Sequence, residues 1–287
     1  MFLGIDLGTS EVKALLLDHE HRVVGVAGSA LQVFRPHPGH SEQQPDDWWQ
    51  ATQSALAQLR QQQPREYAAV KAIGLSGQMH GAVLLDKNNT VLRPAILWND
   101  TRSSLECEQM MAELPDLPQI AGSLAMPGFT APKLRWVAKH EPAVFEKIAK
   151  VLLPKDYVRL LLTGEHVSEM SDASGTMWLD VEKRDWSTAL LDLTGLDVSQ
   201  MPRLVEGDEV SGVLSAQAAQ TLGLPAGIVV AGGAGDNAAS AIGMGAVHDG
   251  EGFLSLGTSG VLFVVTPRYQ PNAASAAHAF CHAVSNR

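Results

Sequence analysis

The sequence predicts an α/β fold, and three stretches of it carry that prediction. Residues 2–30 have the pattern of a three-stranded meander, and a helical pattern follows them directly. A second stretch of alternating strand and helix runs from about 151 to 205. From Gly227 onward a buried strand, a glycine-rich turn and a helix of small residues follow one another. Strands that alternate with helices in this way are typical of the α/β class.

The first strands are expected at 2–6, 12–17 and 23–27. They are joined by LGTSE and by the polar turn DHEHR, which are too short for the crossover that parallel strands need, so we expect antiparallel neighbours. A helix should begin near Pro45, because a first-turn residue needs no backbone N–H, and the two aspartates that follow favour the positive end of the helix dipole. The strand VKAIGLS comes next.

In the middle of the chain, two strands are expected on either side of the turn at 87–89. Residues 103–165 look largely helical, and the segment LLPKDYVRLLLTG near its end reads as an amphipathic helix closed by Gly164. We expect interruptions of the helical region at its four prolines, which are Pro115, Pro118, Pro127 and Pro132.

The tetrapeptide LGTS occurs twice, at 7–10 and at 256–259, each time between apolar runs that predict a hairpin. Two copies so far apart indicate a duplicated architecture, because the repeats of an array recur at about 20 to 50 residues. A Gly-Thr-Ser tip gathers backbone N–H groups and two hydroxyls at one point, which suits a phosphate. The alternative is an ordinary tight turn.

Composition narrows the classes of partner. With 21 Lys and Arg against 31 Asp and Glu, the net charge is −10 and the pI about 5.4, which argues against nucleic acid or an anionic membrane as main partner. Only Cys107 and Cys281 occur, so a reducing compartment and a cytoplasmic location are expected. No signal peptide is expected at the start, and no apolar run approaches about 18 residues.

Two aspartates follow predicted strands. Asp6 ends the first strand beside the first LGTS, where a carboxylate would repel phosphate unless Mg²⁺ lay between them; the alternative is a solvated turn residue. Asp236 follows the glycine-rich strand end in GGAGDNAAS. It is either a helix N-cap or a general base that deprotonates a hydroxyl attacking phosphorus.

Further polar candidates lie at other predicted strand ends. Met79 and His80 stand between two glycines in SGQMHGA, and LWNDTR sets Trp98 and Asn99 side by side, as sugar-binding clefts often do. Simple packing is the alternative for each pair. The segment HAFCH has some metal-ligand character, but no second Cys/His cluster completes a tetrahedral site.

Seven motifs in order resemble those of the FGGY carbohydrate kinases: GIDLGTSEVK, GQMHG, ILWNDTR, GFTAPKLRWVAKHE, SDASGTMWLD, GAGDNAA and LSLGTSGV. The resemblance covers all 287 residues, and the GQMHG version is similar to that of members acting on D-xylulose. It implies an actin-like, ribonuclease-H-like ATPase fold, with 1–225 as sugar-binding domain and 226–287 as the start of a nucleotide-binding domain. It also implies ATP and Mg²⁺ in a cleft and transfer of the γ-phosphoryl group to a ketopentose hydroxyl.

The resemblance assigns roles by motif. Asp236 would be the base, Asp6 would orient Mg²⁺, and Met79 and His80 would contact sugar, with Trp98 and Asn99 as weaker candidates. Sugar binding is expected to close the domains and exclude water. The groups expected to hold the phosphates of ATP are Thr9, Ser10, Lys13, Thr258 and Ser259.

Two departures from the family pattern bear on these roles. At position 11, relatives often have a small residue where this chain has Glu11. The charge of Glu11 is unfavourable beside a triphosphate unless the side chain points to solvent. The adenine-binding glycine motif is absent from these 287 residues, so we expect weak sugar binding and little kinase activity from the chain by itself. The final hairpin would lack sheet partners, and we expect self-association, such as a homodimer, through 253–265.

Three other functions remain open. An ATP-driven chaperone or filament protein of the same fold would hydrolyse nucleotide without sugar, and would leave GQMHG and LWNDTR without a role. A non-catalytic sugar-binding module would bind pentose without dependence on ATP. A kinase for another acceptor, such as ribulose, fuculose or glycerol, would keep the same site with a different preference.

Overall fold

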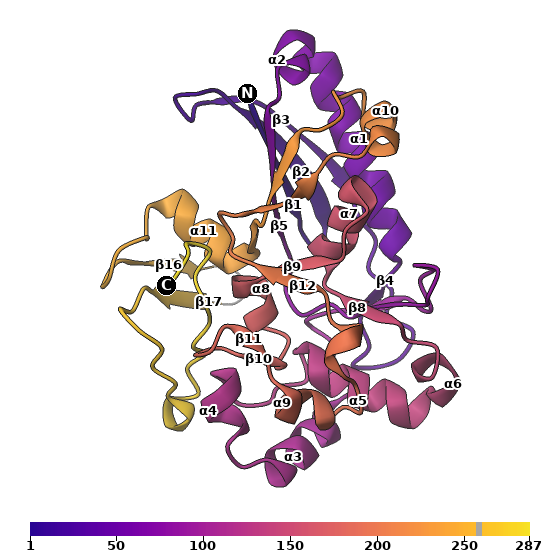
Figure 1. The fold of residues 1–287 in the computed structure, drawn as a ribbon, viewed down its shortest axis with the longest axis vertical. Helices are drawn as coiled ribbons and strands as arrows, with labels where there is room; N and C mark the ends of the chain where they lie inside the picture. The colour runs from indigo at the N-terminus through magenta and orange to yellow at the C-terminus, as the bar shows by residue number, and fades with distance from the viewer. Residues whose placement is uncertain (257–259) are drawn as a thin grey trace.

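The computed structural model describes residues 1–256 and 260–287, and a seven-stranded sheet forms its upper part (Figure 1). As predicted, the first three strands are an antiparallel meander, and the first strand also pairs in parallel with the strand after the long helix. The spatial order is β13 (Val210–Val213), β14 (Val229–Ala231), β5 (Ala72–Gly77), β1 (Phe2–Leu7), β2 (Glu11–Leu17) and β3 (Val23–Ala30), with β15 (Ala234–Gly235) also paired to β5.

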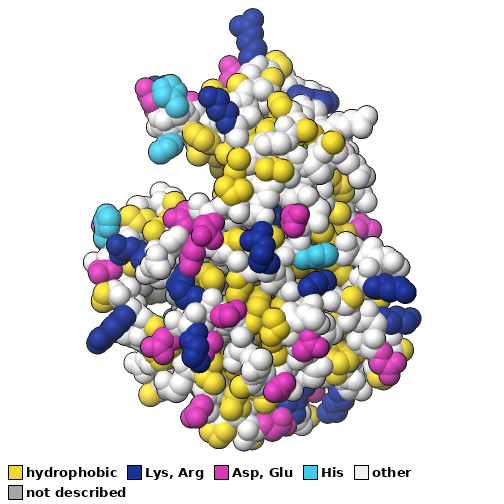
Figure 2. All heavy atoms as spheres, viewed as in Figure 1, with side chains coloured by type: hydrophobic (Ala, Val, Ile, Leu, Met, Phe, Trp, Pro, Cys, Tyr) yellow, Lys and Arg dark blue, Asp and Glu magenta, His cyan; other side chains and the backbone are white. Residues whose placement is uncertain are grey.

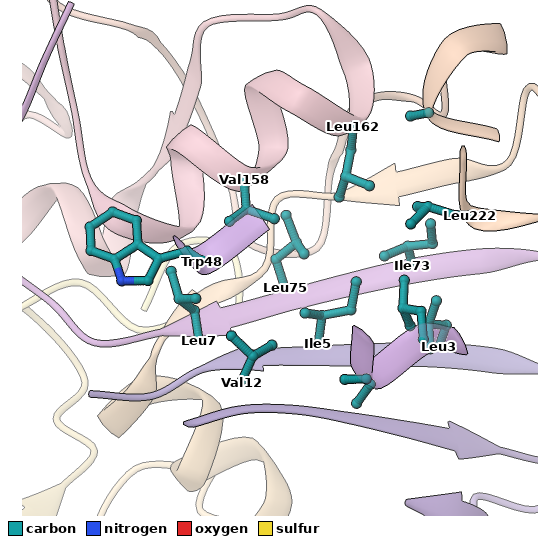
Figure 3. Close-up of a cluster of buried hydrophobic side chains, with 14 of the residues drawn as sticks. Leu3, Ile5, Leu7, Val12, Trp48, Ile73, Leu75, Val158, Leu162 and Leu222 are labelled. Carbon is teal, nitrogen blue, oxygen red and sulfur yellow. The ribbon is translucent and has the colours of Figure 1, made fainter. Parts of the chain in front are cut away.

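Three helices cover one face of this sheet: α1 (Pro45–Gln62), α7 (Pro154–Thr163) and α10 (Ala216–Leu222). Strand side chains alternate between the two faces, and Leu3 and Ile5 of β1 point into this core (Figure 3). Burying each of these side chains contributes about 1.5–3 kcal/mol. The same alternation turns Asp6 to the opposite face of the sheet.

A second core lies below the sheet and is largely helical (Figure 1). It packs helices of the 103–145 region against short two-stranded sheets. The remaining elements of the chain are β4 (Glu42–Gln43), α2 (Pro64–Ala68), β6 (Val83–Leu85), β7 (Ala95–Ile96), α3 (Ser104–Glu113), α4 (Leu117–Ala121), α5 (Thr130–His140), α6 (Pro142–Phe145), β8 (Lys150–Leu152), β9 (Val167–Glu169), α8 (Met170–Ser174), β10 (Leu179–Asp180), β11 (Asp185–Trp186), α9 (Thr188–Asp192), the 3-10 turns at Val198–Gln200 and Ala273–Ser275, and β12 (Arg203–Val205).

The four prolines do not act alike. Pro115 and Pro127 fall between helices, as predicted. The predicted interruptions at Pro118 and Pro132 are wrong, because these residues lie within the first turns of α4 and α5. A first-turn residue needs no N–H for the helix, so proline starts these helices and does not break them. The expected strands on either side of 87–89 are present but short, as β6 and β7, and they are joined by isolated antiparallel bridges between Leu85 and Val91 and between Ala82 and Ile96.

The last hairpin forms a separate two-stranded sheet from β16 (Gly252–Leu256) and β17 (Gly260–Val264) beside α11 (Asp236–Met244). Phe253 and Phe263 face inward and stack on each other. Leu254 and Leu262 are directly paired across the strands on the outer face, with 62% and 73% of their surface exposed. Among the described residues, none of the helices has the length and apolar character required to cross a bilayer.

Candidate active site

Strand register brings three polar side chains together on the helix-free face of the sheet. Asp6 of β1 is paired with Lys13 of β2 on one side and with Ser76 of β5 on the other. Directly paired residues project to the same face, so all three belong to one surface. The Ser76 hydroxyl donates to Oδ1 of Asp6 at 2.7 Å, which fixes the carboxylate at the end of its strand.

The first LGTS forms the turn between β1 and β2. The backbone N–H of Gly8 donates to the carbonyl of Glu11 at 3.0 Å, and a Cβ at position 8 would fall 2.9 Å from that oxygen. The Thr9 hydroxyl donates to Oε1 of Gln78 and accepts from Nε1 of Trp98, at 3.0 and 2.9 Å. Two partners already engage that hydroxyl, whereas Ser10 is exposed. Ser10 is therefore the more accessible hydroxyl for a phosphate.

The second LGTS cannot be placed in the same way. Thr258 and Ser259, which the sequence analysis assigns to phosphate binding, lie outside the described residues. The strands that flank them are described and paired, so the predicted hairpin itself is confirmed.

Two glutamines that the sequence analysis does not single out hold the first turn. Gln43 donates from Nε2 to the carbonyl of Thr9 at 2.8 Å, and its Oε1 accepts from Trp48 and from Gln78 at 3.0 and 2.9 Å. The GQMHG motif could have drawn attention to Gln78, which belongs to it. No sequence motif marks Gln43, which lies 34 positions from Thr9. These bonds tie the turn to the start of α1 and to the end of β5.

Glu11 does not point freely to solvent. Its carboxylate lies 2.9 Å from Nζ of Lys13, two positions along the same strand. The hydrogen bond and the charge of Glu11 raise the pKa of Lys13. Lys13 therefore stays cationic, and its charge is paired with that of Glu11.

We predict that Glu11→Gln strengthens binding of Mg·ADP to this chain about two- to fivefold at low salt, because Lys13 no longer has to leave a carboxylate to meet a phosphate. Fluorescence of Trp98, whose indole is bonded to the turn, provides the titration signal. The control is Glu20→Gln, an exposed glutamate in the turn after β2. Equal or weaker binding by Glu11→Gln would show that Lys13 does not meet the phosphates.

Asp236 is the first residue of α11, and the N-cap position belongs to Gly235, so the alternative of an ordinary N-cap is wrong. Its Oδ1 accepts from the N–H of Asn237 at 2.7 Å. Part of the side chain is exposed to solvent, yet desolvation by the surrounding chain and the charge of Asp6 raise the pKa of Asp236 to about 6. A carboxyl with a raised pKa beside a second carboxylate suits a general base.

The two aspartates meet because three parallel strands run side by side. Ala234 of β15 is paired with Ser76 of β5, and Ser76 with Asp6 of β1. Residues that follow β15 and those that end β1 therefore emerge at one edge of the sheet. The sequence predicts that each aspartate follows a strand. The pairing of β15 with β5 shows in addition that the two strand ends lie close together.

His80 lies just beyond β5 in a left-handed backbone conformation, with φ of +69°. Its carbonyl accepts hydrogen bonds from the Thr130 hydroxyl and from Nζ of Lys133, at 3.1 and 2.9 Å. Both donors belong to the GFTAPKLRW motif, so this motif and GQMHG are held together at His80. Lys133 is fully buried, and burial lowers its pKa well below the ordinary value.

The imidazole of His80 is oriented by the SDASGT motif. Its Nδ1 lies 2.8 Å from the carbonyl of Gly175, and a Cβ at Gly175 would fall 2.5 Å from the ring. Desolvation and the charge of Lys133 lower the pKa of His80 to about 3, so the ring is neutral near pH 7. A carbonyl only accepts, so Nδ1 carries the proton and Nε2 is an acceptor. Such an acceptor suits a sugar hydroxyl.

Met79 and the LWNDTR segment complete the same region. Met79 is buried against the Asp236 loop, since a Cβ at Gly235 would fall 2.9 Å from its sulfur. Trp98 is 45% exposed, and Gly128 packs against its carbonyl. Within residues 1–256 and 260–287, no donor reaches the buried Oδ1 of Asn99. Asn99 thus holds a buried oxygen, unpaired among the described residues, next to an exposed indole.

Aromatic side chains that the sequence analysis missed surround His80. The centroids of His80 and Phe129 are 4.6 Å apart, and Phe280 lies 6.3 Å from His80. His278 stacks on Phe280 at 5.7 Å. Two rings of the HAFCH segment, His278 and Phe280, thus belong to the wall beside His80. In the part of the chain that the structure describes, no group of three His, Cys, Asp or Glu side chains forms a metal site.

The carboxylate oxygens at this edge of the sheet suit a Mg²⁺ ion that keeps part of its water shell. Asp6 and Asp236 offer carboxylate oxygens, and the described residues supply no third acidic ligand beside them. Mg²⁺ commonly keeps several waters and binds one or two carboxylates together with substrate phosphates. The two aspartates suit such a partly hydrated ion, and not one enclosed by protein ligands.

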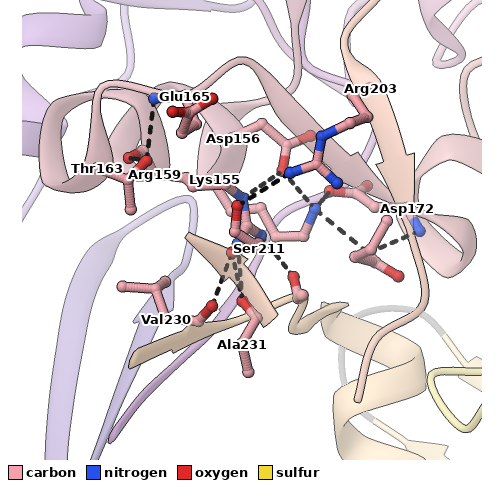
Figure 4. A network of polar contacts seen from close by, with 12 residues as sticks. Lys155, Asp156, Arg159, Thr163, Glu165, Asp172, Arg203, Ser211, Val230 and Ala231 are labelled. Atoms are coloured by element: carbon pink, nitrogen blue, oxygen red, sulfur yellow. Dashed lines mark hydrogen bonds and ion pairs between the residues drawn. The ribbon is translucent and has the colours of Figure 1, made fainter. Parts of the chain in front are cut away.

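Five charged side chains of α7, α8 and β9 form a cluster that we call the buried ion cluster. Figure 4 shows Lys155, Asp156, Arg159 and Asp172 of this cluster. Nζ of Lys155 lies 2.8 Å from both Asp156 and Asp172 and 3.2 Å from Glu169, and Arg159 is the fifth member. All five are buried. The predicted helix that ends at Gly164 is confirmed as α7, and its charged face is turned inward.

A family model described as the FGGY family of carbohydrate kinases, N-terminal domain, matches residues 1–243. The chain is 54% identical over 287 residues to xylulose kinase of Escherichia coli and 52% identical to that of Klebsiella pneumoniae. It covers all of its own length in these matches and 59% of each relative. The chain thus spans well under two thirds of these curated relatives.

Solved structures agree with the sequence relatives. A crystal structure titled as a xyloylose kinase from Brucella ovis matches with a TM-score of 0.97 and 57% identity over 99% of this chain and 58% of that one. Xylulose kinase from Rhodospirillum rubrum matches with a TM-score of 0.91 and 32% identity over 94% of this chain and 56% of that one. The expected actin-like, ribonuclease-H-like ATPase fold is confirmed.

Proposed function

Because the chain belongs to the FGGY family of carbohydrate kinases, we propose that it forms the sugar-binding part of an ATP-dependent kinase that converts D-xylulose to D-xylulose 5-phosphate. The observation that carries the proposal is the meeting of Asp236, whose pKa is raised to about 6, with Asp6 at one sheet edge. Met79 and His80 lie beside that edge. The division into domains at 1–225 and 226–287 stays a prediction.

In this proposal Asp236 accepts the proton of the attacking sugar hydroxyl. A bond forms between that oxygen and the γ-phosphorus, the bond from the γ-phosphorus to the β,γ-bridging oxygen breaks, and ADP leaves. ATP supplies the phosphoryl group and Mg²⁺ offsets the charge of its phosphates. Asp6 holds the ion directly or through water, as its fixed carboxylate allows. Exclusion of water on closure would protect ATP from hydrolysis.

The remaining roles follow from accessibility. Ser10 and Lys13 contact phosphate, and Thr9 acts chiefly through its backbone because its hydroxyl is engaged. Thr258 and Ser259 are proposed for the opposite side of the triphosphate. Nε2 of His80 accepts from a sugar hydroxyl. Met79 and Trp98 pack on the carbon chain, and Asn99 accepts a second hydroxyl if domain closure uncovers its buried Oδ1.

A test of the substrate uses a chimera in which Arg287 is followed by the C-terminal residues of Escherichia coli xylulose kinase that lie beyond the matched segment. ADP release is measured with D-xylulose, D-ribulose, L-fuculose and glycerol. We expect the highest kcat/KM with D-xylulose. A preference for another sugar would replace the substrate, and ADP release that no sugar stimulates would favour a chaperone-like ATPase of this fold.

We expect kcat/KM of the chimera for D-xylulose to rise with pH and to level off above about 6. The pKa of Asp236 is raised to about 6, and a base acts only when ionised, so each pH unit below that value should cost about tenfold. Initial rates from pH 4.5 to 8 provide the measurement. A flat profile down to pH 5 would contradict the assignment of Asp236 as base.

The 287-residue chain by itself should bind D-xylulose weakly and release little ADP, because the family's adenine-binding glycine motif does not occur in it. Turnover equal to that of the chimera would overturn this expectation. The competing function is a sugar-binding module without catalysis. Stimulation of the chimera by sugar distinguishes the two.

The outer face of the β16–β17 hairpin supports a proposal of self-association. Leu254, Leu256, Leu262 and Val264 leave apolar surface exposed on adjacent strands. We predict that sedimentation velocity of the chain shows a homodimer at micromolar concentration and that Leu262→Asp restores the monomer. Leu105→Asp, at an exposed leucine of α3, should leave the dimer intact. A monomeric parent chain would contradict this prediction.

We further propose that the protein acts in the cytoplasm without nucleic acid or a membrane as partner. The net charge of −10 supports this proposal. On the face drawn in Figure 2, Lys and Arg are interspersed with Asp and Glu and do not gather in a broad basic patch.

A further inference from the structure

Segment 231–235, here called loop 231–235, runs from the last residue of β14 through β15, which is paired with β5, and leads into Asp236, the first residue of α11. At Gly232 and Gly233 its backbone packs so closely against the neighbouring chain that a side chain has no room. A Cβ at Gly232 would fall 2.1 Å from the carbonyl oxygen of Glu206, and one at Gly233 would fall 2.1 Å from that of Leu75. Gly233 also has a φ of +77°, which favours glycine. The position of Asp236 therefore depends on what holds this loop.

One end of the loop is held by Arg159 of the buried ion cluster. Its Nη1 donates to the carbonyl of Ala231 at 2.7 Å, and its Nη2 donates to the carbonyl of Gly232 (Figure 4). Nη1 also contacts the hydroxyl of Ser211 on β13. The planar guanidinium thus fixes two consecutive carbonyls of the loop from the fully buried face of α7.

The other end is held by Ser171 of α8. The backbone N–H of Gly235 donates to Oγ of Ser171 at 3.1 Å, and that hydroxyl donates to Oε2 of Glu169 at 2.8 Å. Oε1 of Glu169 lies 3.2 Å from Nζ of Lys155. A buried chain of polar contacts therefore runs from the ion cluster to the residue that precedes Asp236.

Hydrophobic side chains of similar volume often stabilise a core as well as a buried ion group does. They cannot, however, offer directed donors and acceptors to a loop backbone. The cluster keeps two cations among three carboxylates and turns one of the cations, Arg159, toward the loop, while Ser171, bonded to Glu169 of the cluster, presents a hydroxyl to it. Its geometry is thus matched to the backbone groups of 231–235.

We propose that Arg159 and Ser171 are positioning residues that hold Asp236 in reach of Asp6 by fixing loop 231–235 at both ends. The inference concerns the placement of the carboxylate, and its use as a base rests on the proposed function. Neither side chain contacts the reacting atoms in this arrangement.

The test compares Ser171→Ala with Ser168→Ala in the 287-residue chain. Ser168 is an equally buried serine three positions away, and no described residue bonds its hydroxyl. The first readout is amide hydrogen exchange at Gly235. Ser171→Ala should accelerate it about five- to tenfold, the factor that one buried hydrogen bond supplies. Ser168→Ala should leave it unchanged.

The second readout is amide exchange at Asn237, whose N–H donates to Oδ1 of Asp236 at 2.7 Å. Ser171→Ala should accelerate this exchange too, because release of segment 231–235 moves the start of α11 and with it this bond. Ser168→Ala should leave it unchanged.

Exchange at Gly235 and Asn237 in Ser171→Ala that equals that in Ser168→Ala would overturn the inference. Arg159→Lys provides the second variant, since it keeps the charge but loses the paired donors; it should raise exchange at 231–233 at 25 °C while the helices of the second core stay protected. Uniformly faster exchange would mean general destabilisation and would count against positioning. Both readouts are independent of kinase activity, so failure of the proposed function leaves them interpretable.

Discussion

Replacing Asp236 by asparagine is expected to lower D-xylulose-dependent ADP release by the chimera about 10²- to 10⁴-fold, the range that a general base supplies. The amide keeps the shape of the side chain and its bond with the N–H of Asn237, but it cannot take a proton from a hydroxyl. Binding of D-xylulose should remain within a few-fold of the parent. The loss should therefore appear in kcat and not in KM.

Asp192→Asn is the matched control for this substitution. Asp192 is an exposed aspartate at the end of α9, a helix whose leucines pack into the second core. Its rates should equal those of the parent. If Asp236→Asn retains more than a tenth of the parent kcat, Asp236 is not the base. Sugar affinity is therefore measured on the same samples. Loss of D-xylulose binding in Asp236→Asn would show that the side chain holds the sugar, and the fall in rate would then not report on a base.

Lys155→Met is expected to lower the free energy of unfolding by about 3–5 kcal/mol. Lys155 contacts three buried carboxylates, and its removal leaves Asp156, Glu169 and Asp172 with Arg159 as their remaining cationic neighbour in the cluster. Burial already raises the pKa of Asp172 to about 8. Without Lys155, these carboxyls must take up protons or draw in water, and either response costs stability. Urea unfolding followed by tryptophan fluorescence measures the change.

The control for Lys155→Met is Lys183→Met, which removes a largely exposed lysine from its ion pair with Asp180. Exposed pairs contribute little, so the two variants should differ widely in urea midpoint. Equal midpoints would show that the cluster is no more important to stability than a surface ion pair.

Much of the fold could be predicted from local patterns. Short connections fixed the antiparallel order of β1 to β3, and proline and two aspartates marked the start of α1. Gly164 ends α7 in the left-handed conformation expected of a C-cap glycine, with φ of +82°. Asp6, His80 and Asp236 were found because polar residues at strand ends stand out against apolar strands.

Contacts between distant segments could not be predicted in this way. Nothing local indicates that Trp98 bonds to Thr9 or that Gly175 packs on His80. The charges of α7 have helical spacing that fits a solvated face equally well, and only α8 and β9 beside them reveal that they are buried. Pro118 and Pro132 misled for a related reason, since proline permits a helix start as readily as it forbids a helix interior.

The central claim is that a sugar site is built within these residues by strand ends that meet at one edge of the sheet. Isothermal titration calorimetry of the 287-residue chain with D-xylulose tests it most directly, with glycerol as the comparison ligand. We predict saturable binding of one D-xylulose per chain, with at least about tenfold weaker binding of glycerol, a factor worth about 1.4 kcal/mol. No saturable heat with D-xylulose, or equal affinity for glycerol, would contradict the account.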